Sequence, residues 1–374
     1  MSRRGDANVR IGVVGLGYWG PNLVRNIADS SRTELAWLCD LDAQILSSMA
    51  RRYPDAKLTT DVATMLADPE LDAVVIATPI STHHTLASAA LAAQKHVWVE
   101  KPLASSSRDA SDLVQRAEAS NLVLLPGHTF LYSPPVVKIK ELIEGGELGE
   151  IYFVSMSRVN LGLHQTDASV LWDLAPHDFS ILRYWLGDLP SEVSGMTRAC
   201  LIPDTPDVAF VNMRFAGGAI AHLELSWLSP SKLRRTTIIG SEKMIMYDDT
   251  SHEPVRIFDS GASLRDPESF EEYRLTYRSG DIVSPRIDAT EPLALEVDDF
   301  CSAILDGKPP RSSTEIGLDV VCAIEAVERS IDAGGGLVTV KASQSAEGGP
   351  TGPARRSDRK STARGDGAVA ARPA

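Results

Sequence analysis

The chain has 374 residues, a net charge of −13 at pH 7 and 43% hydrophobic residues, values ordinary for a soluble protein of more than one domain. Its acidic balance argues against an extended nucleic-acid partner, because phosphate backbones are bound by basic surfaces. No apolar run approaches the roughly 20 residues that a membrane-spanning helix needs, and no apolar stretch typical of a secretory signal is found. We therefore expect a cytoplasmic protein with no nucleic acid and no membrane among its partners.

Residues 1–127 predict a Rossmann domain, a doubly wound parallel sheet, because short β-like runs alternate there with helix-like stretches. The expected strands are 9–14, 34–39, 72–77, 96–100 and 121–125. The expected helices are 21–29, 42–52, 61–67, 83–94 and 105–119. The near-continuous apolar run at 73–77 suits a strand that is buried on both faces.

Residues 128–341 predict a second α/β domain with a large, mostly antiparallel open sheet. The expected helices are 134–144, one ending at Gly187, 292–306 and 315–333. The expected strands are 151–159, 191–199, 207–215, 219–228, 234–240, 244–248, 254–258 and 336–341. Residues 342–374 have almost no large apolar side chains and cannot offset their ordering entropy, so we predict a disordered tail.

The four cysteines, Cys39, Cys200, Cys301 and Cys322, lie far apart and form no C-x-x-C pair. This spacing supports neither a disulfide framework nor a zinc ribbon. The histidines also lack ligand-like spacing with cysteines or acids on one element, so we expect no metal site.

The pattern Gly15-x-Gly17-x-x-Gly20 joins the first predicted strand to a helix that opens at Pro21. In a dinucleotide site the first glycine allows the turn, the second lets the backbone approach a pyrophosphate, and the third permits close helix packing. The other reading is a tight turn that binds nothing. The position of the pattern between a strand and a helix favours the dinucleotide.

Asp40 ends the second predicted strand, where a carboxylate can accept hydrogen bonds from both hydroxyls of an adenosine ribose. A 2′-phosphate would be repelled by Asp40, with Asp42 nearby, and no arginine immediately follows to receive it. The alternative is a solvated acid at a strand end, but the spacing from the glycines fits a βαβ unit. The sequence therefore predicts NAD rather than NADP.

A series of motifs in chain order resembles the Gfo/Idh/MocA family of sugar and inositol oxidoreductases over about residues 9–340. The motifs are Gly15-Leu16-Gly17-Tyr18-Trp19-Gly20, Ala77-Thr78-Pro79 with His83, Glu100-Lys101-Pro102, and Asp173-x-x-x-His177. Within the family, segments 19–26 and 172–178 are most similar to nucleotide-sugar dehydrogenases. One departure is that residues 167–172 stand where many members have a glycine cluster, which puts the shape of the substrate loop in question.

The resemblance implies a Rossmann domain, a second domain whose open sheet mediates oligomerisation into a dimer or tetramer, and an active site in the cleft between them. By position, the implied catalytic residues are Lys101, Asp173 and His177. The expected cofactor-binding residues are Gly15, Gly17, Tyr18, Trp19, Gly20, Asp40, Thr78, Pro79, His83 and Glu100, of which His83 also has a structural interpretation. Segments expected to border the cleft supply the candidate substrate-binding residues His128, Arg158, Asn160 and His164.

The chemistry explains this set, because oxidising a secondary alcohol removes a hydride, which the cofactor accepts, and a proton, which the protein must accept. His177 is the candidate base, and Lys101 can stabilise developing alkoxide charge. Asp173, four residues before His177, can orient the imidazole or Lys101 if both share one turn of helix. Pro176 then predicts that this helix begins at or just after Asp173. The structural alternatives are a surface lysine, a helix cap and a satisfied polar residue.

The sequence thus predicts an NAD-dependent oxidoreductase acting on a secondary alcohol of a nucleotide-linked hexose, at C3, to give a 3-keto sugar. The alternatives are an inositol or free-sugar dehydrogenase, an NAD-dependent glycosidase, and a noncatalytic NAD-binding sensor. Retention of Lys101, Asp173 and His177 together argues against the sensor.

Overall fold

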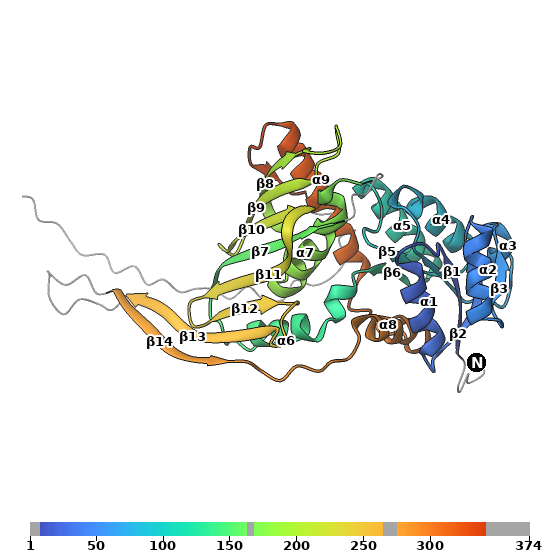
Figure 1. Ribbon diagram of the computed structural model, residues 1–374, viewed down its shortest axis with the longest axis horizontal. Helices are drawn as coiled ribbons and strands as arrows, with labels where there is room; N and C mark the ends of the chain where they lie inside the picture. Colours follow the sequence, from blue (N-terminus) through green and yellow to red (C-terminus); the bar gives the residue numbers. More distant parts are fainter. Residues whose placement is uncertain (1–7, 163–167, 265–274, 342–374) are drawn as a thin grey trace, which may run out of the picture. The chain divides into compact units, whose positions relative to one another are not determined.

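The computed structural model describes residues 8–162, 168–264 and 275–341. These residues belong to one compact unit, Met1–Ser343 (Figure 1). The predicted tail and His164 lie outside the described residues. Among the described helices, none is long and apolar enough to cross a membrane.

The N-terminal part contains a parallel sheet, which in the described residues has the strand order β3-β2-β1-β4-β5-β6. Its strands are β1 (Val9–Val14), β2 (Thr33–Cys39), β3 (Lys57–Thr59), β4 (Ala73–Ile76), β5 (His96–Glu100) and β6 (Leu124–Gly127). Its helices are α1 (Gly20–Asp29), α2 (Ala43–Arg52), α3 (Val62–Leu66), α4 (Ile80–Ala92) and α5 (Ser107–Ser120). This order confirms the predicted Rossmann fold, in which a ligand binds where the strand order reverses, beside β1 and β4.

Strand β3 was not predicted, and several boundaries in this part differ from the prediction by a few residues. Helix α4 begins at Ile80, three residues early, because Pro79 has the extended backbone of an N-cap residue. Helix α5 continues to Ser120 and ends at Asn121, whose left-handed φ of 54° suits a helix C-terminus. Strand β6 therefore starts at Leu124 rather than at residue 121.

The second sheet has the order β14-β13-β12-β11-β7-β10-β9-β8-β15 within the described residues and is antiparallel except where β7 pairs with β10. Its strands are β7 (Ile151–Leu161), β8 (Pro190–Arg198), β9 (Val208–Phe215), β10 (Ile220–Ser226), β11 (Leu228–Gly240), β12 (Met244–Asp248), β13 (Val255–Leu264), β14 (Leu275–Val283) and β15 (Val338–Thr339). The helical elements of this half are η1 (Thr129–Tyr132), α6 (Pro134–Glu144), α7 (Val170–Leu186), α8 (Pro292–Asp306) and α9 (Thr314–Asp332).

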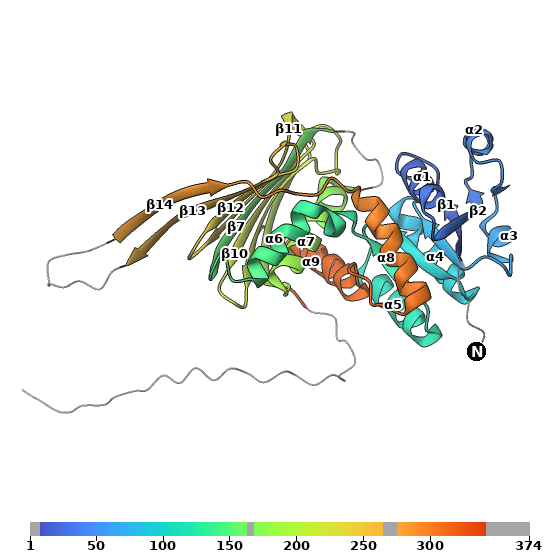
Figure 2. The same ribbon diagram turned by 90° about the horizontal axis from the view of Figure 1, so that it is seen from below.

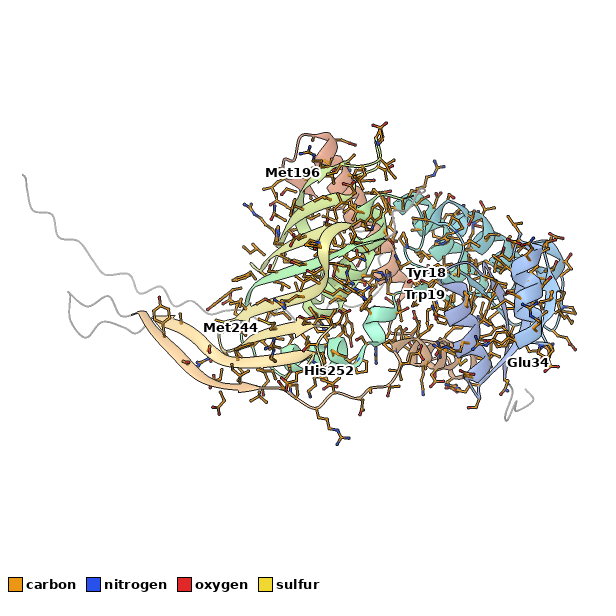
Figure 3. All side chains as sticks on the ribbon, viewed as in Figure 1. Tyr18, Trp19, Glu34, Met196, Met244 and His252 are labelled. Carbon is orange, nitrogen blue, oxygen red and sulfur yellow. The ribbon has the colours of Figure 1, made fainter. Side chains whose placement is uncertain are left out.

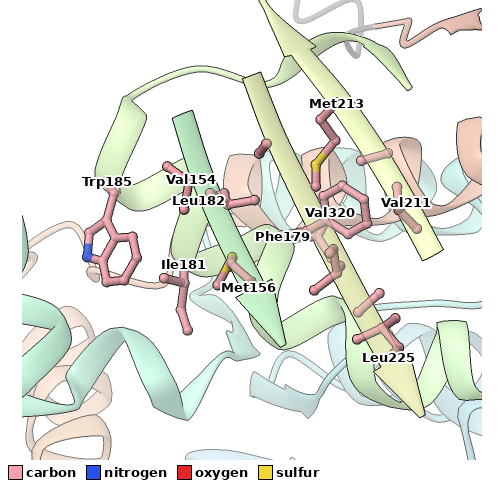
Figure 4. Packing of buried hydrophobic residues seen from close by; sticks show 14 of the residues in the cluster. Val154, Met156, Phe179, Ile181, Leu182, Trp185, Val211, Met213, Leu225 and Val320 are labelled. Carbon is pink, nitrogen blue, oxygen red and sulfur yellow. The ribbon is translucent and has the colours of Figure 1, made fainter. Parts of the chain in front are cut away.

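Helices α6, α7 and α9 lie on one face of the large sheet, as Figure 2 shows. Alternate residues of β7 point to this face, so Val154 and Met156 pack against Phe179 and Leu182 of α7 (Figure 4). Helix α8 instead returns to the Rossmann sheet, where Phe300 packs edge-on against Trp98 at a ring-centroid distance of 5.7 Å. The chain therefore crosses from the second sheet back to the first.

Helix α7 begins at Val170, three residues before the predicted start. Pro176 consequently lies inside the helix, where it has no N–H to donate to the carbonyl of Trp172. Asp173 still lies in the first helical turn, and His177 lies one turn later, so the two residues are on the same side of α7 as predicted.

Candidate active site

The glycine loop between β1 and α1 has the shape that a dinucleotide site requires. Gly15 has φ +90°, and a Cβ there would lie 2.5 Å from the carbonyl oxygen of Ala77. A Cβ on Gly20 would collide with the carbonyl oxygen of Gly15, so the helix packs on the turn only without a side chain. Gly17, in contrast, has no atom within 4 Å of the same position. The backbone at Gly17 therefore adjoins open space, and the loop fits a pyrophosphate at the start of α1.

The carboxylate of Asp40, at the end of β2, is held against this loop. Its Oδ2 accepts a hydrogen bond from the Leu16 N–H at 2.7 Å, and its Oδ1 accepts one from the Asp42 N–H at 2.8 Å. These bonds fix the carboxylate beside the glycines, while each oxygen keeps a second lone pair. A ribose placed over the loop can donate to these positions, so the residues present fit NAD.

Tyr18 and Trp19 project from the same loop and are 87% and 37% exposed (Figure 3). The indole Nε1 of Trp19 donates to Glu100 Oε1 at 2.9 Å, which links the loop to the end of β5. The Lys101 N–H donates to Glu100 Oε2 at 3.3 Å. Burial raises the pKa of Glu100 to about 7. Through Trp19 and Glu100, the glycine loop is thus connected to Lys101.

His83 is buried in α4 and joins the ends of two strands. Its Nε2 lies 2.9 Å from the carbonyl oxygen of Thr78, and its Nδ1 lies 2.9 Å from that of Pro102. Thr78 and Pro79 follow β4, and Pro102 follows Lys101 through a cis peptide bond. His83 therefore supports the positions of Thr78 and Lys101 from beneath the loops.

Lys101 and Asp173 form the centre of the site. The Lys101 ammonium donates to the main-chain oxygen of Asp173 at 2.7 Å and to its Oδ1 at 3.2 Å. The other carboxylate oxygen of Asp173 accepts from Trp227 Nε1 at 3.1 Å. Lys101 and Asp173 keep 19% and 22% of their side chains exposed, so both can meet a ligand. Of the two groups that Asp173 was predicted to orient, the structure pairs it with Lys101.

His177 is partly exposed, one turn along α7 from Asp173, and packs edge-on against Phe130 at 4.9 Å between ring centroids. Its Nδ1 is buried with no hydrogen-bond partner among the described residues. Burial lowers the pKa of His177 well below 6.5, and the positive charge of Lys101 lowers it further. The imidazole is therefore neutral at physiological pH and available to accept a proton.

The structure brings two of the other predicted substrate residues to this region. Arg158 of β7 stacks over the ring of Phe130 at 4.7 Å. Asn160, two residues along the same strand, lies beside Gly162 next to Trp227. His128 is only 1% exposed, so a direct substrate contact requires its neighbours to move, and burial lowers its pKa to about 3.

Three further residues of the site, Trp227, Phe130 and Arg234, were not predicted. Trp227 bonds to Asp173, Phe130 packs against His177, and Arg234 lies over the ring of Phe130. Trp227 follows β10 directly and Arg234 lies in the middle of β11, where the alternating pattern predicts only a strand. No motif marks these positions. The contacts of Trp227 and Arg234 depend on strand pairing, and that of Phe130 depends on the packing of η1 against α7. The pattern specifies neither.

A parallel doubly wound sheet with an open glycine loop, and a lysine, an aspartate and a neutral histidine next to it, define a nicotinamide-dependent oxidoreductase. Residues 9–128 match the Gfo/Idh/MocA oxidoreductase family's NAD-binding Rossmann fold, and residues 136–246 match that family's C-terminal domain. Together these matches cover more than half of the chain. The chain belongs to the Gfo/Idh/MocA family, and its N-terminal part is an NAD-binding Rossmann domain.

Individual relatives agree with this assignment. Scyllo-inositol 2-dehydrogenase (NAD⁺) of Bacillus subtilis (strain 168) is 27% identical over 318 residues, which cover 82% of this chain and 89% of that protein. GenD2 from gentamicin A biosynthesis, solved in complex with NAD, is 26% identical with a TM-score of 0.76 and covers 91% of this chain and 100% of its own. UDP-N-acetylglucosamine 3-dehydrogenase GnnA from Acidithiobacillus ferrooxidans is 24% identical with a TM-score of 0.74, and the match covers 87% of this chain and 98% of that one. This similarity supports the assignment of the fold.

Proposed function

We propose that the protein oxidises a secondary alcohol of a sugar and transfers its hydride to NAD at the site formed by Lys101, Asp173 and His177. The observation that carries this proposal is the Lys101 ammonium, held by two hydrogen bonds to Asp173 beside a neutral His177. A single proton acceptor and a nearby cation are what alcohol oxidation requires of the protein.

Each residue has a distinct role in this proposal. His177 accepts the hydroxyl proton through Nε2, because its Nδ1 is buried. Lys101 donates a hydrogen bond to the same oxygen and stabilises its developing negative charge. Asp173 positions the Lys101 ammonium, and Trp227 in turn positions Asp173. Bound NAD supplies the hydride acceptor at its nicotinamide ring.

We assign the cofactor contacts to the loops around this group. Gly15, Gly17 and Gly20 with the start of α1 hold the pyrophosphate, and Asp40 binds the adenosine ribose. Five further residues line or support the nicotinamide side, namely Tyr18, Trp19, Thr78, Pro79 and Glu100. His83 acts beneath them as a positioning residue, because it is buried and joins Thr78 to Pro102.

We propose a nucleotide-linked hexose, oxidised at C3, as the substrate. The similarity of segments 19–26 and 172–178 to nucleotide-sugar dehydrogenases supports this choice. An inositol is the second candidate, and the identity with scyllo-inositol 2-dehydrogenase favours it. The two differ in charge, since a nucleotide sugar carries a pyrophosphate and an inositol carries none.

A substrate panel tests the proposal. Purified protein is incubated with NAD and, separately, nucleotide-linked hexoses, free hexoses and inositols while NADH absorbance is followed. We expect NADH with a nucleotide-linked hexose, and no NADH from the His177→Ala variant, which should still bind NADH with unchanged affinity. Faster turnover of an inositol would overturn the substrate assignment. Wild-type rates in His177→Ala would overturn the assignment of the base.

We also propose that the protein is a homo-oligomer assembled through the uncovered face of the large sheet. In the described residues, no helix covers this face, and it exposes apolar side chains on neighbouring strands (Figures 2 and 3). These side chains are Phe153, Met196, Phe210 and Ile220. Phe153 and Ile220 border a hollow of about 350 Å³ on this face. Exposed apolar patches of this kind are typical of interfaces between copies. Ile220→Asp should lower the molar mass measured by light scattering, and an unchanged mass would contradict this proposal.

All four cysteines are unpaired in the structure. Free thiols persist in a reducing compartment, which supports the proposed cytoplasmic location.

A further inference from the structure

Two arginines face each other directly across neighbouring strands of the large sheet. Arg158 of β7 and Arg234 of β11 are register partners in the antiparallel pair. Both lie on the same face of the sheet as the buried Val154 and Ile238. Two positively charged side chains therefore stand next to apolar ones on this face. Like charges directly opposite each other destabilise a sheet, so this pairing has a cost that packing alone does not explain.

Both guanidinium groups converge on the aromatic ring that also contacts the proposed base. Arg158 Cζ lies 4.7 Å and Arg234 Cζ 5.7 Å from the centroid of Phe130. The same ring packs against His177. The two arginines therefore lie beside the reacting position, and their positive charges contribute to lowering the pKa of His177.

The internal acids do not use all the donors of this pair. Arg158, 6% exposed, donates from Nε and Nη2 to Asp178 at 2.7 and 2.8 Å, while its Nη1 is buried without a partner among the described residues. Arg234 donates to Asp249 Oδ2 at 3.2 Å through Nη1, and its side chain remains 35% exposed. A buried guanidinium nitrogen without an acceptor is costly, and an incoming anion would supply one.

We propose that Arg158 and Arg234 form an anion-binding subsite that holds a negatively charged substituent of the sugar whose hydroxyl is oxidised. Arg234 contacts the anion from the exposed side, and Arg158, fixed by Asp178, provides the buried charge. A carboxylate and a phosphate each present a pair of oxygens that can accept two parallel hydrogen bonds from one guanidinium group. The inference rests on the proposed function, and it selects charged sugars over neutral polyols.

Binding of small sugars to the complex of the protein with NADH tests the subsite by calorimetry. The probes are glucose, glucuronate and glucose 1-phosphate, which present no charge, a carboxylate and a phosphate. At least one charged probe should bind about tenfold more tightly than glucose, or more. Preference for glucuronate identifies a carboxylate as the recognised group, and preference for glucose 1-phosphate identifies a phosphate. Equal affinity for all three probes, or no measurable binding of either charged probe, overturns the proposal.

Arg235 offers a matched control, because it is the next residue on β11, points to the opposite face and pairs with Asp248. Arg234→Gln should abolish the preference for the charged probe, Arg234→Lys should retain part of it, and Arg235→Gln should leave it unchanged. An equal loss in Arg234→Gln and Arg235→Gln overturns the subsite.

The proposed function is judged separately by NADH formation. Charge-selective binding without hydride transfer from any sugar would refute the proposed oxidation but not the anion-binding subsite. Equally efficient oxidation of neutral and charged sugars would refute the subsite and leave the function.

Discussion

The indole N–H of Trp227 donates a hydrogen bond to the carboxylate of Asp173 at 3.1 Å. Trp227 follows β10, whereas Asp173 lies in the first turn of α7, so this bond ties the sheet to the helix that carries two of the proposed catalytic residues. Because the other oxygen of Asp173 accepts from Lys101, Trp227 fixes the lysine through one intermediate.

Replacing Trp227 by phenylalanine should therefore reduce turnover without weakening the binding of NAD. We expect kcat to fall by about tenfold to a hundredfold, since small displacements of catalytic groups have effects of this size. The control is Trp185→Phe, which removes another buried indole N–H, bonded to the Val136 carbonyl away from the site. Steady-state kinetics compares the two variants, and an equal loss of kcat in both would show a general packing effect.

The pH dependence of kcat/KM should report His177. A proton acceptor must be neutral, so activity is lost as pH falls through its pKa. Because burial, Lys101 and the two arginines lower that pKa, activity should persist below pH 6.5. Arg234→Gln removes one positive charge and should move the acid limb to higher pH, while Arg235→Gln should not. A limb that stays at the same pH in Arg234→Gln would speak against this electrostatic coupling.

Cofactor choice should depend on Asp40. Asp40→Ser removes the charge that repels a 2′-phosphate, so the ratio of kcat/KM for NAD to that for NADP should fall. Asp42→Ser is the control, because Asp42 caps α2 through Gln44 and Ile45. Serine caps a helix N-terminus about as well as aspartate, so that variant should keep its stability, and its ratio should fall much less than that of Asp40→Ser. A ratio unchanged by Asp40→Ser would remove Asp40 from the ribose site.

Stability should vary with pH through Glu296, which lies fully buried in α8. Burial raises its pKa well above 4.5, and the charge of Glu100 adds to the effect. The native state thus keeps a proton that the unfolded chain releases above pH 4.5, so the free energy of unfolding falls as pH rises, by up to about 1.4 kcal/mol per unit. Glu296→Gln cannot ionise, and its stability relative to wild type should increase between about pH 5 and pH 8.

Denaturant titrations at several pH values measure this difference. Glu147→Gln is the control, because Lys243 lowers the pKa of the exposed Glu147 and any linkage then acts only as pH falls below 4.5. The difference between Glu147→Gln and wild type should stay constant over the range tested. A constant difference for Glu296→Gln as well would mean that Glu296 is ionised in the native state.

The Rossmann half could be predicted in detail because its signals are local. Apolar runs, the glycine pattern and Asp40 all lie within short stretches of chain. The structure brings them together at the carboxyl ends of the central parallel strands. Boundaries were wrong where a single backbone conformation decides them, as at Asn121. Strands β3 and β14 were not predicted. Each pairs with a single neighbour at one edge of its sheet, and most of its described side chains are exposed, so neither shows a clear apolar pattern.

The second half of the site depends on long-range pairing and could be predicted only in part. The motif places Asp173 and His177 one turn apart, but it does not tell whether the carboxylate meets Lys101 or the imidazole. The facing of Arg158 and Arg234 follows from the register of β7 and β11, which are separated in sequence and share no motif. For these residues the fold adds information that the pattern lacks.

Transfer of a deuterium label from the sugar to the cofactor would show directly that the protein oxidises a sugar hydroxyl with NAD. A nucleotide-linked hexose deuterated at C3 is incubated with NAD and the protein, and the nicotinamide is examined by mass spectrometry and NMR. We expect deuterium at nicotinamide C4 with wild type and none with Lys101→Met or His177→Ala. Unlabelled NADH from the deuterated sugar, or label transfer that persists in both variants, would contradict this expectation.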